Sequence, residues 1–164
     1  MKTALTLSAV VTTAAITCGA SDSANFIAHL TQKSREHIQR AETFGKQSQQ
    51  LRQELCATAE ECAVANWDGY GALPIEIEAY RNAYRLIEAL PATTPTPTVG
   101  AEPDGAVTFE WYVTPHRTIS VSIDSNALLN YAAMFGVSSV FGTEPFLGEL
   151  PSQISGLIAR LHMK

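Results

Sequence analysis

Charged residues are scarce in this sequence. Asp, Glu, Lys and Arg make up 16% of its 164 residues, below the value of about a quarter that is usual in soluble proteins. The eleven basic residues are scattered and the formal net charge is −5, so the chain lacks the Lys and Arg clusters with which proteins bind phosphates. We therefore predict that the protein does not bind nucleic acid and that its surface consists largely of uncharged polar residues.

Cysteine is also scarce. The three cysteines are Cys18, Cys56 and Cys62, and an odd number fits a disulfide framework poorly. Cys56 and Cys62 lie six residues apart on a predicted helix, about 9 Å along its axis, whereas a disulfide joins Cα atoms within about 7 Å. We expect reduced, buried thiols. No spacing of Cys and His is typical of zinc, so we predict no metal and no other cofactor.

Long apolar runs are absent, and we predict no membrane-spanning helix. The first twenty residues, MKTALTLSAVVTTAAITCGA, nevertheless have the outline of a secretory signal. Such a signal would be cleaved after Ala20, or lipidated at Cys18. Five Thr and Ser residues interrupt the apolar stretch between Thr3 and Ile16. For that reason we favour an ordinary N-terminal element of a cytoplasmic chain and keep export as the alternative.

Proline is absent from residues 21–66, and Gly45 is the only glycine there. Apolar or small residues recur three and four positions apart, which predicts one long helix, or a helix pair broken near Gly45, with a single stripe. The stripe consists of Ile27, Leu30, Ser34, Ile38, Ala41, Phe44, Ser48, Leu51, Leu55, Ala59 and Cys62. It packs either on the rest of its own chain or on another protein or a second copy, and we leave both alternatives open.

A second helix is predicted to follow the turn NWDGYGALP at residues 66–74. Pro74 is suited to a first helical turn, and the helix should end near Leu90. We expect its buried face to consist of Ile77, Tyr80, Ala83, Tyr84, Ile87 and Leu90. The Pro/Thr stretch at 91–97 is predicted to be an extended, non-helical linker.

The remaining sequence predicts a sheet and a last helix. Apolar and polar residues alternate at 106–114 and 119–123, and shorter strand signals occur at 98–101 and 128–135, which is typical of three or four antiparallel strands with one covered face. We predict a loop from Gly136 to Gly148, then a helix from about Leu150 that packs on one sheet face. Its buried residues should be Leu150, Ile154, Leu157, Ile158 and Leu161. The predicted fold class is α+β, with an N-terminal element at 1–20, a helical segment at 21–66 and an α+β domain at 67–164.

Three segments have distinctive local sequences: NWDGYGALPI at 66–75, VGAEPDGAVTFEWY at 99–112 and FGTEPFLGELP at 141–151. Together they resemble a family of small uncharacterised bacterial proteins, over roughly residues 60–164. The resemblance implies an N-W-D-G-x-G-A turn, a P-D-G hairpin that leads into an apolar strand ending in E-W, and a short C-terminal helix. It implies no activity.

The turn at 66–74 holds the first candidate binding residues, Trp67, Asp68 and Tyr70. Two aromatic side chains beside a carboxylate would stack on a planar or sugar ligand and hydrogen-bond to it. The alternative is structural: Asp68 accepts N–H bonds that hold the turn, and Trp67 fills the core. We favour the structural interpretation.

Further candidates lie on the predicted strands and loops. Glu110 and Tyr112 are on the polar side of their strand, where a carboxylate with a raised pKa would serve as a general base and a solvated one would not. His116 and Arg117 lie in a hairpin turn, free to meet an anion or simply solvated. Glu144 belongs to the glycine-rich loop, which either closes over a ligand or wraps the sheet edge. None of these residues is predicted to be catalytic.

The motifs of common enzyme classes are missing. The sequence has no nucleophile elbow, phosphate-binding loop, dinucleotide fingerprint or zinc-binding helix, which favours a protein without enzymatic activity. We therefore expect a protein-binding module, such as an adaptor, inhibitor or immunity-type factor, that uses the helical stripe or the polar face of the sheet. Two alternatives remain. One is a small-ligand binder or carboxylate-based hydrolase that gathers Trp67, Asp68, Tyr70, Glu110 and Glu144. The other is an exported or lipid-anchored protein with residues 21–66 as a stalk.

Overall fold

The computed structural model describes residue 32 and residues 45–163, and all of these except Gln32 belong to one compact unit that spans residues 38–164. The predictions for residues 1–20, including Cys18 and Ala20, and for the stripe from Ile27 to Phe44 lie outside the described residues. After a helix over residues 45–61, the elements are α2 (Ile77–Ala89), β1 (Thr98–Ala101), β2 (Val107–Thr114), β3 (Arg117–Ile123), β4 (Leu128–Phe135), β5 (Ser138–Pro145) and α3 (Ser152–His162).

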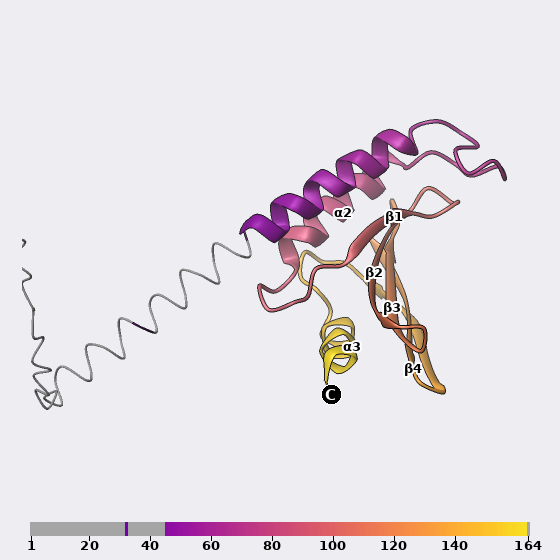
Figure 1. Ribbon diagram of the computed structural model, residues 1–164. Coiled ribbons are helices and arrows are strands. Elements are labelled where there is room, and N and C mark those ends of the chain that lie inside the picture. Colours follow the sequence, from indigo (N-terminus) through magenta and orange to yellow (C-terminus); the bar gives the residue numbers. More distant parts are fainter. Residues whose placement is uncertain (1–31, 33–44, 164) are drawn as a thin grey trace, which may run out of the picture. The chain divides into compact units, whose positions relative to one another are not determined.

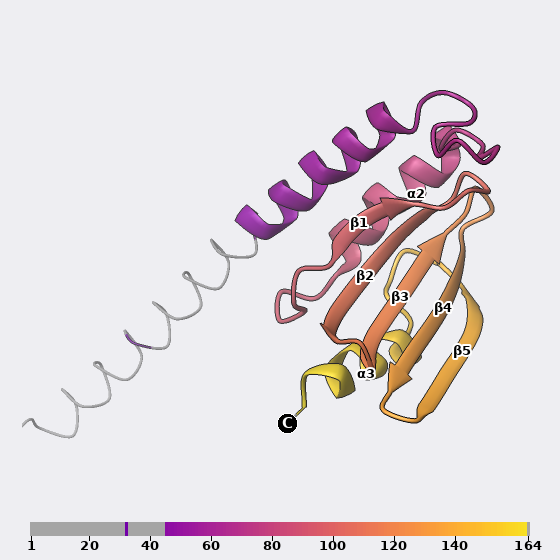
Figure 2. The same ribbon diagram turned by 45° about the vertical axis from the view of Figure 1, so that its right-hand side comes forward.

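The five strands form one antiparallel meander in the order β1-β2-β3-β4-β5. Figure 1 shows the sheet nearly edge-on, and Figure 2 shows the strands side by side in this order. Each strand therefore pairs with its neighbours in the sequence, and the connections are short turns. The α+β class is confirmed, as is the C-terminal helix. The sheet has five strands, so the prediction of three or four strands is one or two short.

The missing strand is β5, and the loop predicted from Gly136 to Gly148 is wrong over most of its length. Glycines at 136, 142 and 148 and the proline at 145 are typical of turns, and this composition concealed the strand. Gly142 is a strand residue for a packing reason. A Cβ atom at this position would lie 2.5 Å from the Tyr131 hydroxyl, so only glycine leaves room for the tyrosine of the neighbouring strand.

One face of the sheet is covered by helices. Figure 2 shows the sheet from its other face, with the helices behind it. Alternate residues of the three central strands point into the core, as the period of a half-buried strand requires. The fully or almost fully buried strand residues are Val107, Phe109, Trp111, Ile119, Val121, Ile123, Leu129, Tyr131 and Ala133.

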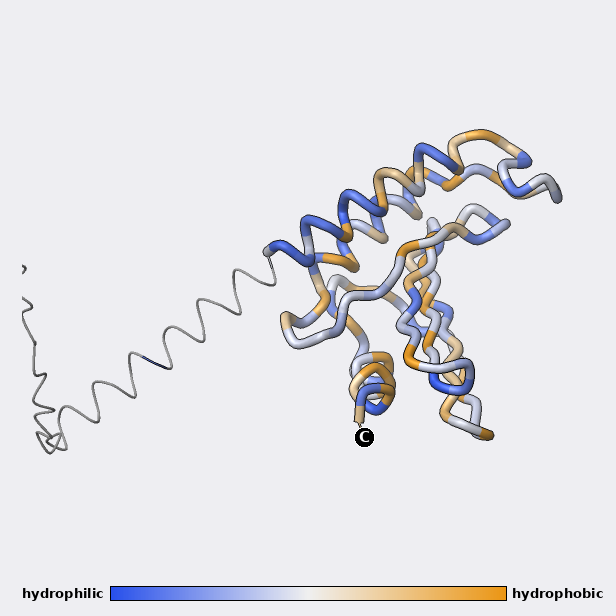
Figure 3. Tube along the Cα trace, in the orientation of Figure 1, coloured by the Kyte–Doolittle hydropathy of each residue, from blue (hydrophilic) through white to orange (hydrophobic). Residues whose placement is uncertain are grey.

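The helices supply the second layer. Ile154, Ile158 and Leu161 of α3 are buried, which confirms most of the predicted face of this helix. Leu51 and Leu55 of the helix over residues 45–61 belong to the same core, so the described part of the predicted stripe packs on its own chain. Figure 3 shows the resulting alternation of hydrophobic and hydrophilic residues along helices and strands.

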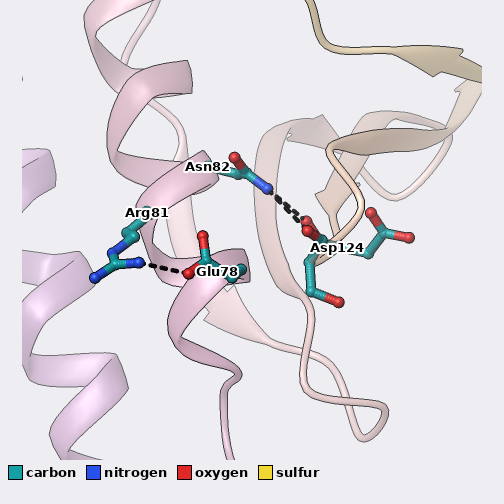
Figure 4. Close-up of polar contacts among 5 residues, drawn as sticks. Glu78, Arg81, Asn82 and Asp124 are labelled. Carbon is teal, nitrogen blue, oxygen red and sulfur yellow. Dashed lines mark hydrogen bonds and ion pairs between the residues drawn. The ribbon is translucent and has the colours of Figure 1, made fainter.

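The predicted buried face of α2 is confirmed in part, since Ala83, Ile87 and Leu90 are buried and Tyr80 and Tyr84 pack against the core. Its buried residues are Ala79, Asn82, Ala83, Leu86 and Ile87, whereas Ile77 is 63% exposed. One buried residue that was not predicted, Asn82, is polar and hydrogen-bonded. The Asn82 side-chain amide donates hydrogen bonds to the carbonyl oxygens of Asp124 (3.1 Å) and Ser125 (3.4 Å), which ties α2 to the β3–β4 turn (Figure 4). Glu78 and Arg81 form an ion pair on the outer side of the helix.

The Pro/Thr stretch at 91–97 is non-helical, as predicted, but it packs on the sheet. The indole N–H of Trp111 donates a hydrogen bond of 2.6 Å to the carbonyl oxygen of Pro95, and Pro97 is buried. This segment therefore belongs to the domain and closes the core beside β2.

Candidate functional site

The turn at residues 66–74 is held by its own side chains. Asp68 Oδ1 accepts hydrogen bonds from the backbone N–H groups of Tyr70 (2.8 Å) and Ala72 (3.0 Å), and Asn66 Oδ1 accepts one from Gly71 (2.7 Å). These N–H donors stabilise the charged carboxylate and hold the pKa of Asp68 below its usual value. One of the two carboxylate oxygens of Asp68 is therefore used by the turn itself.

The aromatic side chains of this turn do not converge on a site. Trp67 is half-buried and donates its indole N–H to the carbonyl oxygen of Leu73 (2.9 Å), and it is not part of the core that was expected to receive it. Tyr70 is 95% exposed. The turn is also joined to the β1–β2 hairpin, because the Leu73 N–H donates to the Pro103 carbonyl (2.8 Å) and the Glu76 N–H donates to the Gly105 carbonyl (3.2 Å).

Arg117 is bound to α3. Its Nη2 donates hydrogen bonds to the carbonyl oxygens of Leu161 (2.7 Å), Met163 (2.6 Å) and Arg160 (3.3 Å). The last carbonyls of a helix lack partners within the helix and carry partial negative charge, so a guanidinium at this end is stabilising. Arg117 thus serves as the C-terminal cap of α3, whereas its neighbour His116 is exposed.

The two strand carboxylates lie on opposite faces. Glu110 of β2 is exposed on the open face, where it accepts a hydrogen bond from the Thr118 hydroxyl (3.1 Å). Glu144 of β5 pairs with the buried Leu129 and so points to the covered side. Three strand spacings separate β2 from β5, about 14 Å, so these two groups do not reach one substrate. The structure does not bring together the five residues of the proposed carboxylate site.

One side of the sheet is not covered by any other part of the described chain. We use "open face" for the side of the sheet opposite the helices, whose members follow from the strand register because paired residues point to one side. They are Thr98, Gly100, Thr108, Glu110, Tyr112, Thr118, Ser120, Ser122, Leu128, Asn130, Ala132, Met134, Ser139, Phe141, Thr143 and Pro145. Glu110 is the only charged member.

Apolar side chains gather on the β4–β5 half of the open face, with one aromatic on β2. Phe141 is 81% exposed, Tyr112 61%, and Leu128 and Met134 38% each. Of these, only Tyr112 was among the predicted binding residues. Phe141 was missed because the face of β5 alternates Ser, Phe and Thr with no apolar period, so no strand was predicted there. Met134 lies on β4, where a strand was predicted but no exposed side was assigned.

The described residues offer little support for a reactive thiol pair, a metal site or a membrane-spanning helix. Cys62 is buried, and this burial raises the pKa of its thiol, with a smaller contribution from Glu61. Cys56 is exposed on the outer side of its helix, so the prediction of buried thiols is wrong for this residue. Both are free. Within residues 45–163, no group of three or more His, Cys, Asp or Glu side chains is arranged to hold a metal ion. No helix in that range is long and apolar enough to cross a membrane.

Comparison of the chain with protein-family models, with curated proteins and with solved structures gives no match. The resemblance to the small bacterial family therefore stays a prediction. Two of its motifs, the turn at 66–74 and the P-D-G hairpin at 103–105, are in contact through the hydrogen bond from the Leu73 N–H to the Pro103 carbonyl.

Proposed function

We propose that the chain is a protein-binding module whose binding surface is the open face of the sheet. The observation that carries the proposal is the exposure of Phe141, Met134 and Tyr112 on a face with a single charge. Aromatic residues and methionine are enriched, and Lys, Glu and Asp depleted, in the buried centres of protein interfaces. The composition of the open face supports this kind of contact.

The size of the face also supports the proposal. Five strands span about 24 Å, and eight residues along a strand span about 26 Å, which gives about 600 Å². Stable protein interfaces use about 800 Å² per partner, and weaker ones somewhat less. The open face with its adjoining turns is in this range.

The hydroxyl groups on the open face indicate which kind of partner surface would fit it. Thr118, Ser120 and Ser122 form a row of donors and acceptors along β3, beside the apolar band on β4 and β5. A nucleic acid would need Lys or Arg here, and the open face has neither. We expect a protein partner with an uncharged surface that presents apolar side chains and hydrogen-bonding groups.

A photoreactive benzoylphenylalanine in place of Met134 tests the proposal in the cells that make the protein. The matched control carries the same group in place of Ile77, an apolar residue that is exposed on α2, away from the open face. We expect one discrete protein adduct from position 134 and none from position 77. Equal adducts from both positions, or none from either, contradict the proposal.

The partner found in this way allows a quantitative test. Ala132 is exposed near the middle of the open face, and Ala132→Arg places a long charged side chain there. We expect the dissociation constant, measured by calorimetry, to rise at least tenfold, roughly the loss of one strong contact. Ile77→Arg is the control and should leave it unchanged.

A further inference from the structure

The two edges of the sheet differ in length and protection. β1 has four residues, with Pro97 immediately before it and Pro103 shortly after it. β5 has eight residues and contains no Lys or Arg; its one charged residue, Glu144, and its only proline, Pro145, stand at its end, so residues 138–143 are uncharged and free of proline. Proteins usually block a long uncharged edge with Lys, Pro or a covering element, because it offers free N–H and C=O groups to another strand. β1 is blocked in this way and β5 is not.

The geometry of the β4–β5 hairpin determines which backbone groups of β5 point away from β4. β4 and β5 are joined by the two-residue turn Gly136-Val137, with Phe135 opposite Ser138. The pair that closes a two-residue turn exchanges both of its hydrogen bonds, and the following residues alternate between inward and outward groups. Ser139, Phe141 and Thr143 therefore direct their N–H and C=O groups away from β4.

Exposed apolar side chains follow the same edge. Val137 is fully exposed in the turn, Phe141 is 81% exposed in the strand and Leu147 is 86% exposed just after it. The turn is hydrophobic in the colouring of Figure 3. Free backbone groups and apolar side chains thus coincide at β5, which favours pairing with another strand over solvation.

We propose that β5 pairs antiparallel with β5 of a second copy of this chain, about a twofold axis at Phe141, to form one continuous sheet. This inference goes beyond the proposed function. It concerns the edge, leaves the open face free apart from the contact between the two Phe141 rings, and places two open faces side by side for a partner. The two proposals stand or fall separately.

The sequence of β5 is complementary to itself about this axis. In that register Phe141 lies opposite Phe141, and Ser139 lies opposite Thr143, so aromatic meets aromatic and hydroxyl meets hydroxyl. Val137 lies opposite Pro145, and Glu144 lies opposite Ser138, which avoids a pair of like charges. An axis at residue 142 would place Ser139 opposite Pro145, which has no N–H to donate. The axis at Phe141 therefore pairs the largest number of residues that have both a backbone N–H and a C=O group to contribute.

The mass of the full chain in solution is the first test. We expect sedimentation to show an increase from 17.7 kDa toward twice that value as the protein is concentrated from about 1 µM to about 200 µM, a range that covers micromolar dissociation constants. Phe141→Lys places two like charges opposite each other and should keep the chain monomeric. Tyr70→Lys is the matched control, because it also replaces an exposed aromatic, 95% exposed, with lysine, and it should leave the dimer intact.

Cysteine pairing tests the register and does not depend on how well Phe141→Lys folds. In a background with Cys18→Ser and Cys56→Ser, Phe141→Cys should form a disulfide-linked dimer, because Cα atoms of a hydrogen-bonded pair are about 5.5 Å apart. Thr143→Cys alone should not, since its two copies would be about 13 Å apart along the strands. Thr143→Cys mixed with Ser139→Cys should link again.

Three outcomes overturn the proposal: a monomer at every concentration, a dimer that Phe141→Lys leaves intact, or a disulfide in Thr143→Cys as efficient as in Phe141→Cys. In each case a protein adduct at position 134 would still support the proposed function. A β5 dimer whose open face gives no adduct would support the pairing alone.

Discussion

The two faces of the sheet are built from the same strands but follow different rules. In β3, Ile119, Val121 and Ile123 are fully buried under the helices, whereas Thr118, Ser120 and Ser122 between them lie on the open face. Threonine, like isoleucine, has a high β propensity, and its hydroxyl group can remain exposed to solvent. Within residues 45–163, a single layer of helices covers one face of the sheet, and no helix covers the second face.

The composition of the open face also changes across the sheet, from β3 to the β4–β5 edge. Around β3 the open face is hydroxyl-rich, but on β4 and β5 it carries Leu128, Met134 and Phe141. Apolar residues on the covered face determine whether the chain folds. We infer that those on the open face determine what the folded chain binds. Substitutions separate these two roles.

Phe109 and Phe141 give the sharpest contrast. Phe109→Ala removes a fully buried ring and should lower the free energy of unfolding by about 3–5 kcal/mol. Phe141→Ala should change it by less than about 0.5 kcal/mol, because the ring is mostly exposed. Urea unfolding of dilute protein measures both without a contribution from association. A large loss in Phe141→Ala would mean that the open face is covered within the chain.

Gly142 tests whether the covered face extends to β5. Gly142→Ala places a methyl group 2.5 Å from the Tyr131 hydroxyl, which itself hydrogen-bonds to Gln153 of α3 (3.1 Å). Displacing the tyrosine should lower the free energy of unfolding by about 1–3 kcal/mol in urea unfolding. Gly156→Ala in α3 meets nothing within 4 Å and should be neutral or stabilising by up to about 1 kcal/mol. Equal effects at the two positions would contradict the packing argument.

The sequence predicted the covered face well and the edge poorly. The alternation in Val107, Phe109 and Trp111 is strong enough to identify β2 and its buried side, and the 3.6-residue period at Ile154, Ile158 and Leu161 identifies α3. β5 lacks such a period. Its Gly142 is required by Tyr131 of another strand, and a contact of this kind leaves no local trace in the sequence.

The candidate site was harder to predict for the same reason. Arg117 looked free for an anion, but it is bound by the end of α3, which is more than forty residues away in the sequence. Asp68 was predicted to hold its turn, and it does, because both of its N–H partners lie within four residues. Local hydrogen bonds can be inferred from sequence, whereas long-range partners need the fold.

Arg117 tests how α3 is held against the covered face. Arg117→Met keeps the length of the side chain and removes the donor from the last carbonyls of the helix. We expect urea unfolding to show a loss of about 1–2 kcal/mol in the free energy of unfolding, between the values for a helix-end charge and a charged hydrogen bond. His116→Ala changes the exposed neighbour and should have little effect. If both variants lose the same amount, the turn rather than the cap is responsible.

Asp68 belongs to neither face and gives the smallest expected effect, which depends on pH. Hydrogen bonds from Tyr70 and Ala72 lower its pKa in the folded chain, so in acid the unfolded chain binds the proton more readily than the folded one. Its contribution to stability is therefore complete above the unfolded pKa of about 3.9 and is lost as the pH falls through that value toward the lower folded pKa. The urea midpoint of Asp68→Asn should lie below that of the wild type at pH 7, and the gap should shrink as the pH falls below about 4. Asp104→Asn, in the neighbouring hairpin, is the control. If this variant showed a gap of the same size that shrank in the same way, the hydrogen bonds of the 66–74 turn would not be the source of the effect. The structural role assigned to the 66–74 turn would then be contradicted.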